Sequence, residues 1–180
     1  NLHGFNIGVF LGNGDGTFQS PISRPIPENH IGNTLLTGDF NGDGNTDLVL
    51  QTSKGAGVLL GNGDGTLQPL NDYASGSVSS YGLLVSDLTG DQQQDVVVIA
   101  ASDIDVIPGN GDGTLGSALA YYNPNSSSAS YSSVTADFNG DGRPDILTSP
   151  VSGASLAMML GGASPVLSAT MTHSNSFIVG

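Results

Sequence analysis

Short apolar or alternating runs follow one another along the whole chain, separated by clusters of glycine, asparagine, aspartate and serine. The runs NTLLTGDF, YGLLVSDL and YSSVTADF lead into aspartate-rich segments, and DLVLQ, DVVVIA and DILTS follow those segments. Such runs between turn residues are typical of β-strands, and no segment has the 3.6-residue period of an amphipathic helix. The pattern predicts an all-β fold.

Two sequence landmarks repeat with one period of about 49 residues. The motif GNGDGT begins at Gly12, Gly61 and Gly109, and a degenerate copy, LGGASPVL, begins at Leu160. The aspartate-rich segments begin at Asp39, Asp87 and Asp137 with the same spacing. A fixed period of this length indicates a repeat architecture.

Each repeat contains four short runs, as expected for one four-stranded antiparallel blade of a β-propeller. At this period the 180 residues form about 3.7 blades, an incomplete ring. We expect these units: residues 1–30, the third and fourth strands of a blade; residues 31–80, a blade; residues 81–130, a blade; residues 131–180, a blade and the start of the next. The unpaired strand edges at both ends invite association. The chain is then a fragment of a longer propeller, the ordered part of a larger protein, or a self-assembling protomer.

The composition excludes several functional classes. The formal net charge is -13, with only three Lys and Arg residues, which argues against binding to nucleic acid or to anionic membrane surfaces. No apolar run is long enough for a membrane span, so we expect no membrane insertion. The first residues lack the basic start of a signal peptide, so the chain is expected to be mature or truncated. Without cysteine it forms no disulfide.

The aspartate-rich segments have the composition of metal-binding loops. In DFNGDGNTD, DLTGDQQQD and DFNGDGRPD, three aspartates crowd into nine positions and repel one another unless a cation is bound. Side-chain oxygens at positions one, three, five and nine, with the backbone carbonyl at position seven, suit Ca²⁺ better than Mg²⁺ or Zn²⁺. The expected ligands of three Ca²⁺ sites are Asp39, Asn41, Asp43, Asn45 and Asp47; Asp87, Thr89, Asp91, Gln93 and Asp95; and Asp137, Asn139, Asp141, Arg143 and Asp145.

Alternatives to calcium binding differ between the loops. An EF-hand is disfavoured because position twelve holds Leu50, Val98 or Thr148 in place of glutamate. The loops can also be plain Asp/Asn/Gly turns, most of all the second, which has Thr89 at position three and Gln92 in place of a glycine. We expect this loop to have the lowest affinity. The GNGDGT motifs, with one aspartate each, are expected to be turns.

The motifs DFNGDGNTDLVL, DFNGDGRPDIL and VLLGNGDGTL resemble the FG-GAP repeats, also called VCBS repeats, of integrin alpha-subunit propellers and many secreted bacterial proteins. The resemblance covers nearly the whole chain. It implies a propeller, usually of seven blades, with calcium on one face. It also implies an extracellular, secreted or cell-surface protein with a role in adhesion or, as in similar fungal lectins, in sugar recognition.

From these features we expect a calcium-stabilised binding module whose partner is a protein or a glycan at the cell surface. Two alternatives remain: a subunit of an extracellular fibre, which binds further copies of itself, and a lectin-like propeller. An enzyme is not expected, because no GxSxG or HExxH signature is present. Asp103 and Asp105, which flank Ile104, are expected on the exposed face of a strand. The five tyrosines are expected to pack in strands, which weakens the lectin alternative.

Overall fold

The computed structural model of the 180-residue chain describes residues 5–27, 32, 34–76, 80–123, 130–150 and 156–161. Its regular elements are strands arranged in four antiparallel sheets. The sheets are composed of β1 (Phe5–Val9) and β2 (Ile22–Ile26); β3 (Leu35–Gly38), β4 (Asp47–Thr52), β5 (Gly55–Leu59) and β6 (Asn71–Ala74); β7 (Ser80–Ser86), β8 (Asp95–Ala100), β9 (Asp103–Ile107) and β10 (Leu119–Tyr122); and β11 (Ser130–Ala136), β12 (Asp145–Pro150) and β13 (Ala157–Met159).

Within each sheet, strands that are neighbours in sequence are also neighbours in space. In the second sheet Thr37 pairs with Leu48, and Leu48 pairs in turn with Leu59. The predicted strands before and after each aspartate-rich loop are therefore present, and the expected all-β architecture of four-stranded antiparallel sheets is confirmed. No helix in the described part of the chain is long and apolar enough to cross a membrane.

The sheets pack face to face, and the hydrophobic core lies between them. Val49 and Val58 of the second sheet pack in one cluster with Leu83 and Val96 of the third. A second cluster joins the third sheet to Ile146 and Met159 of the fourth, and a third joins Ile26 of the first sheet to Leu50 and Leu59 of the second. Because both faces of β4 and β8 are covered in this way, these strands have almost continuously apolar sequences.

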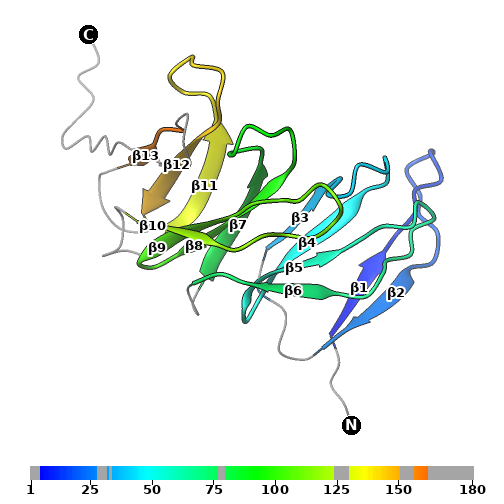
Figure 1. Ribbon diagram of the computed structural model, residues 1–180. Helices are drawn as coiled ribbons and strands as arrows, with labels where there is room; N and C mark the ends of the chain where they lie inside the picture. Colours follow the sequence, from blue (N-terminus) through cyan, green and yellow to red (C-terminus); the bar gives the residue numbers. More distant parts are fainter. Residues whose placement is uncertain are drawn as a thin grey trace.

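Figure 1 shows the sheets following one another along an arc that does not close into a ring. The first strands of successive sheets are neighbours, because β7 contacts both β3 and β11. This is the arrangement of blades in a propeller, where the first strand of each blade lies innermost. The expected start of a further blade, at residues 177–180, lies outside the described residues.

One interpretation of the sequence is wrong. Asp105 does not lie on an exposed strand face, because its side chain is completely buried in β9. The neighbouring sheets cover both faces of this third strand, so an alternating pattern there does not mark a solvent-exposed face. Tyr73 and Tyr121 do pack against the core clusters, whereas Tyr122 is 71 % exposed.

Candidate functional site

The three aspartate-rich loops join the first and second strands of the second, third and fourth sheets. The GNGDGT turns of the second and third sheets join the third and fourth strands, and therefore lie at the same end of the blade as the loops (Figure 1). This end carries the three aspartates of each loop and the single aspartate of each turn. Most of the acidic residues of the chain are thereby gathered along one edge of the arc.

The first aspartate of each loop organises the turn that follows it. The Asp39 carboxylate accepts hydrogen bonds from the amides of Gly42 at 2.8 Å and of Gly44 at 3.0 Å. Asp87 and Asp137 accept the equivalent bonds, from Gly90 and Gln92 and from Gly140 and Gly142 respectively. These bonds lower the pKa of the Asp137 carboxyl, the Gly142 amide contributing most. In the first loop each Asp39 oxygen keeps a further lone pair for a ligand. In the other two loops the Oδ1 atom also accepts a bond of 3.2 Å from the amide of Asp91 or Asp141, and the Oδ2 atom keeps a lone pair.

The third and fifth positions add further oxygen atoms to the same turn. The Asp43 carboxylate accepts hydrogen bonds from the Asn45 amide at 2.7 Å and from the Asn41 side chain at 2.9 Å, and these bonds lower its pKa. In the third loop Asn139 and Asp141 form the equivalent bond at 3.0 Å. These bonds fix the shape of the turn, and the carboxylates at positions one and five remain at least partly exposed to solvent.

The second loop departs from this geometry at positions three and six, where Thr89 and Gln92 replace the asparagine and glycine of the other loops. Gln92 has a φ of 68°, whereas Gly44 and Gly142 occupy the equivalent positions with φ of 80° and 85°. A side chain in this left-handed region costs about 1–2 kcal/mol. The Thr89 amide bonds to the Asp95 carboxylate at 2.9 Å. The second loop is therefore more strained than its two counterparts.

The ninth position has a structural role that the sequence did not reveal. Asp47 is completely buried, and its carboxylate accepts one hydrogen bond from the Phe40 amide and another from the Gly61 amide, both at 2.8 Å. The equivalent bonds join Asp95 to Gly109 at 2.9 Å and Asp145 to Gly161 at 2.7 Å. Each buried aspartate therefore links the aspartate loop to the segment after the third strand of its own sheet.

The glycines that receive this link have no room for a side chain. A Cβ atom on Gly61 would overlap the carbonyl oxygen of Thr46, the residue before Asp47. The same clash, with Gln94 and Pro144, is present at Gly109 and Gly161. In the second and third sheets the first glycine of GNGDGT is thus required by a close approach of two backbone segments. The constant spacing of Asp47 to Gly61 and Asp95 to Gly109 was the signal in the sequence for this contact.

The first loop also contacts the next sheet. The Asp39 amide donates to the Gln94 side chain at 3.0 Å, and the Gly113 amide donates to the Phe40 carbonyl at 2.9 Å. Gln94 and Gly113 belong to the loop and the GNGDGT turn of the third sheet. The conformation of this loop is consequently tied to the packing of two successive sheets.

The oxygen atoms of each loop meet some, but not all, of the requirements of a hard cation such as Ca²⁺. Carboxylate and amide oxygens at positions one, three and five lie on one sharp turn, as Ca²⁺ requires. The ninth carboxylate faces inward, and within the described residues no three His, Cys, Asp or Glu side chains are grouped to hold a metal ion. The residues that would hold Ca²⁺ at the solvent side of the loop are thus those at positions one, three and five. The position-seven side chains Asn45 and Gln93 lie against Gly63 and Gly111 of the turns.

The GNGDGT turns are stabilised by their own side chains. In the second sheet, Asp64 accepts hydrogen bonds from the Thr66 hydroxyl at 2.6 Å and from its amide at 2.8 Å, and Asn62 donates to the Thr66 hydroxyl at 2.8 Å. The bond from the Thr66 hydroxyl contributes most to a lowered pKa of Asp64. The other two turns have the same bonds. The aspartate of each turn is therefore explained by its hydrogen bonds to the threonine, without a metal ion.

Comparisons with known proteins agree with the repeat geometry. A family model described as FG-GAP-like repeat matches the chain three times, at residues 6–50, 39–98 and 87–148. No curated protein matches the chain. These matches cover most of its length and follow its period.

Two solved structures are similar to the chain. One is an Agrocybe aegerita lectin, described for specific recognition of non-reducing terminal N-acetylglucosamine, with a TM-score of 0.66 and 21 % identity over 93 % of this chain and 46 % of the lectin. The other is the Photorhabdus luminescens Tc holotoxin pore, with a TM-score of 0.45 and 18 % identity over 98 % of this chain and 11 % of that one. The chain spans less than half the length of the lectin, whose likeness supports the propeller fold.

Proposed function

The chain belongs to the FG-GAP-like repeat family, and from this membership we propose that it is a calcium-binding repeat module of an extracellular protein. Its blades bind a protein or glycan ligand, and it is not an enzyme. The observation that carries the proposal is one hydrogen-bonded loop, repeated in three successive sheets, with solvent-accessible carboxylates at positions one and five.

Calcium has a structural role in this proposal. Three bound Ca²⁺ ions change the formal net charge from -13 to -7 (-13 + 6) and remove the repulsion within each loop. A site at a hundredfold its dissociation constant stabilises the folded state by about 2.7 kcal/mol, so three independent sites contribute about 8 kcal/mol. The first loop bonds to the third sheet through Gln94 and Gly113. Calcium that orders this loop therefore also favours packing of the second sheet against the third.

The test is thermal unfolding in millimolar Ca²⁺, in chelator, and in chelator with excess Mg²⁺. We expect a large rise in Tm with Ca²⁺ alone. Asp43→Asn keeps an acceptor for the Asn45 amide but removes a charge, so it should reduce the calcium response and leave the Tm in chelator nearly unchanged. The matched control is Asp64→Asn in the GNGDGT turn, which should not change the calcium response. A Tm independent of Ca²⁺ would refute the proposal.

Glycan binding is the second candidate function. It is supported by the likeness to a lectin described for recognition of terminal N-acetylglucosamine. The test is a glycan array that includes N-acetylglucosamine-terminated sugars, in Ca²⁺ and in chelator. Binding that depends on Ca²⁺ would support a calcium-stabilised lectin, and no binding to any glycan would exclude it.

A fibre subunit is the third candidate, because large apolar side chains are exposed in the first and last sheets. Phe10, directly after β1, is 57 % exposed, and Val134 of β11 and Leu156, directly before β13, are 49 % and 48 % exposed. Association of two different ends is heterologous and produces open filaments when it does not close. Regular filaments in electron micrographs would support this function, and a monomer on a sizing column would exclude it.

A further inference from the structure

The pair Asn-Gly occurs in two settings along the chain. The aspartate loops contain it at Asn41 and Asn139, here called the loop asparagines, and the GNGDGT turns contain it at Asn13, Asn62 and Asn110, the turn asparagines. All five pairs are followed by aspartate, so they share one local sequence. In such a pair the glycine nitrogen can attack the side-chain carbonyl carbon of the asparagine, because glycine has no Cβ atom to hinder the approach. The five sites therefore offer one reaction in two surroundings.

Most of the geometry of the pair is the same in both settings. The loop glycines Gly42 and Gly140 have φ of 71° and 79°, and the turn glycines Gly14, Gly63 and Gly111 have φ of 84°, 79° and 73°. Each asparagine side chain also donates one hydrogen bond of 2.8–3.0 Å, to the aspartate two residues later in the loops and to the threonine four residues later in the turns. Neither the glycine conformation nor the restraint on the asparagine therefore distinguishes the settings.

The glycine amide does distinguish them. In the loops this amide donates to the first aspartate, from Gly42 to Asp39 at 2.8 Å and from Gly140 to Asp137 at 2.7 Å. Attack on the asparagine requires the glycine nitrogen to lose its proton and to turn toward the side chain. A hydrogen bond from this amide to a carboxylate opposes both steps. The first aspartate of each loop thus protects the asparagine two positions later.

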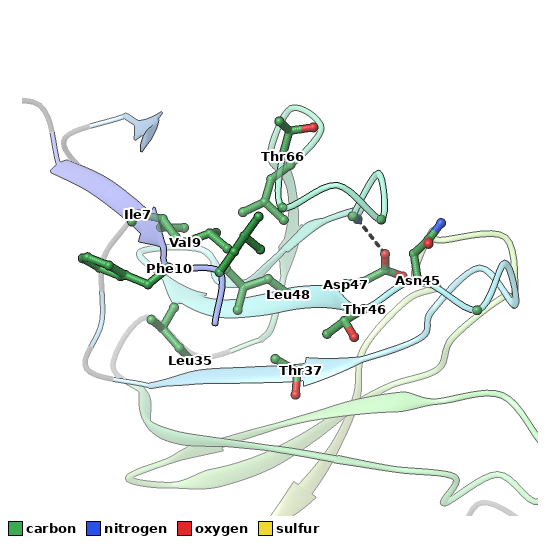
Figure 2. A pocket seen from close by; sticks show the side chains of 17 residues that line it. Ile7, Val9, Phe10, Leu35, Thr37, Asn45, Thr46, Asp47, Leu48 and Thr66 are labelled. Carbon is green, nitrogen blue, oxygen red and sulfur yellow. Dashed lines mark hydrogen bonds between the residues drawn. The ribbon is translucent and has the colours of Figure 1, made fainter. Parts of the chain in front are cut away.

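The turns lack this protection. Within the described residues, no hydrogen bond joins the amide of Gly14, Gly63 or Gly111 to an acceptor. All three turn asparagines are exposed, so water reaches their side chains. In the second sheet Asn45 lies beside the turn that contains Thr66 (Figure 2), and its side-chain oxygen would overlap a Cβ atom on Gly63. Glycine is therefore required at this position, and the asparagine before it keeps its reactive neighbour.

We propose that the turn asparagines are sites of spontaneous deamidation, whereas the loop asparagines are protected from it. At Asn62, the nitrogen of Gly63 forms a bond to the side-chain carbonyl carbon, and the bond from that carbon to Nδ2 breaks. Nδ2 leaves as ammonia with the proton of the glycine amide, and the product is a cyclic succinimide. Water then adds to one of the two ring carbonyl carbons and opens the ring to aspartate or isoaspartate. The inference does not depend on the proposed calcium binding.

The reaction changes the hydrogen bonds of the turn. Asn62 donates to the Thr66 hydroxyl at 2.8 Å, and this hydroxyl gives its own proton to Asp64. A carboxylate in place of the Asn62 amide has no proton to donate, so the bond to Thr66 is lost. The new negative charge also lies in the same turn as Asp64. Deamidation therefore weakens the turn and makes the acidic chain more acidic.

The test is peptide mass mapping of the full chain after incubation in mildly alkaline buffer with chelator, below its Tm in chelator. We expect the turn asparagines to convert to aspartate and isoaspartate at least about tenfold faster than the loop asparagines, because a loop amide first has to break a bond to a charged group. The reference is the chain unfolded in urea, where all five pairs should convert at similar rates. Equal rates at loops and turns in the folded protein, or conversion of the unfolded chain alone, would overturn the proposal.

Asp39→Ala tests the protection directly, because it removes the acceptor of the Gly42 amide. The rate at Asn41 should rise at least about tenfold, whereas Asn139 in the same molecule is the control and should keep its rate. Asp137→Ala should give the reverse result. An unchanged rate at Asn41 in folded Asp39→Ala would contradict the protective role of the bond. Circular dichroism shows whether each variant is folded, and if neither is, the rates in the unsubstituted chain decide.

Discussion

The carboxylate of Asp47 accepts a hydrogen bond from the amide of Gly61 at 2.8 Å, and this bond joins two sequence motifs that lie on different connections of one sheet. Its counterparts occur in the next two sheets. The ninth residue of each loop is thus part of the framework that positions the solvent-accessible oxygens of positions one, three and five. The buried ninth aspartate supports the loop, whereas the carboxylates at positions one and five are at least partly exposed.

Removal of the Asp47 carboxylate should destabilise the protein without calcium. Asp47→Ala leaves the buried amides of Phe40 and Gly61 without their acceptor, at a cost of about 3 kcal/mol. Asp47→Asn keeps one acceptor oxygen and should cost about 1–2 kcal/mol. Urea unfolding in chelator measures both values. The control is Asp43→Asn, whose exposed side chain should change the free energy of unfolding by less than about 0.5 kcal/mol. Equal stability of Asp47→Ala and the control would contradict the role of the link.

The glycine partner of the link should tolerate no side chain. Gly109→Ala places a methyl group on the carbonyl oxygen of Gln94 and should reduce the free energy of unfolding by about 1–3 kcal/mol. Gly82→Ala is the control, since a Cβ atom there meets nothing within 4 Å and the φ is not positive. Thermal unfolding of the two variants gives the comparison. An unchanged Tm for Gly109→Ala would show that the two backbone segments separate at little cost.

Relief of the strain at Gln92 should stabilise the second loop. Gln92→Gly removes a side chain from a residue with φ of 68° and should raise the free energy of unfolding by about 0.5–1 kcal/mol, after the entropic cost of an added glycine. The reverse change, Gly44→Gln in the first loop, should lower it by a similar amount. Chemical denaturation in chelator tests both signs. A destabilising effect of Gln92→Gly would show that its side chain makes a favourable contact that outweighs the strain.

The GNGDGT turns should contribute to stability only above strongly acidic pH. The threonine hydroxyl bonds lower the pKa of Asp15, Asp64 and Asp112 below the ordinary value of 3.8. Their contribution is therefore present above pH 3.8 and is lost as the pH falls through the lowered values of the folded state.

A variant that replaces all three turn threonines with valine tests this dependence. The side-chain bond is the largest cause of each shift, so its removal should raise the pKa of each aspartate and move the acid-unfolding midpoint to higher pH. Circular dichroism during an acid titration measures the midpoint, and NMR titration measures each pKa. Thr37→Val, at an exposed position of β3, is the control. Unchanged aspartate pKa values would contradict the assignment of the cause.

The strands and the repeat could be predicted from sequence because both depend on local patterns. The role of Asp47 could not, since a metal ligand and a buried hydrogen-bond acceptor occupy the same spacing, and only the sheet register brings Gly61 to it. Asp105 was assigned to the wrong environment because its burial depends on which sheets cover β9. The contact of Gln94 with Asp39 joins different sheets and has no counterpart within one repeat. Thus the strands and turns follow from the local pattern, whereas contacts that depend on sheet register or on packing between sheets do not.

The link between loop and turn also indicates where the blade tolerates insertions. The two linked residues are 14 positions apart in the second and third sheets but 16 apart in the fourth, while the bond lengths remain 2.8, 2.9 and 2.7 Å. The connection between the second and third strands, at the opposite end of the sheet from the loops, lies inside this interval. Its length can therefore change while the acidic end keeps its geometry. A peptide tag or a recognition sequence is best grafted there.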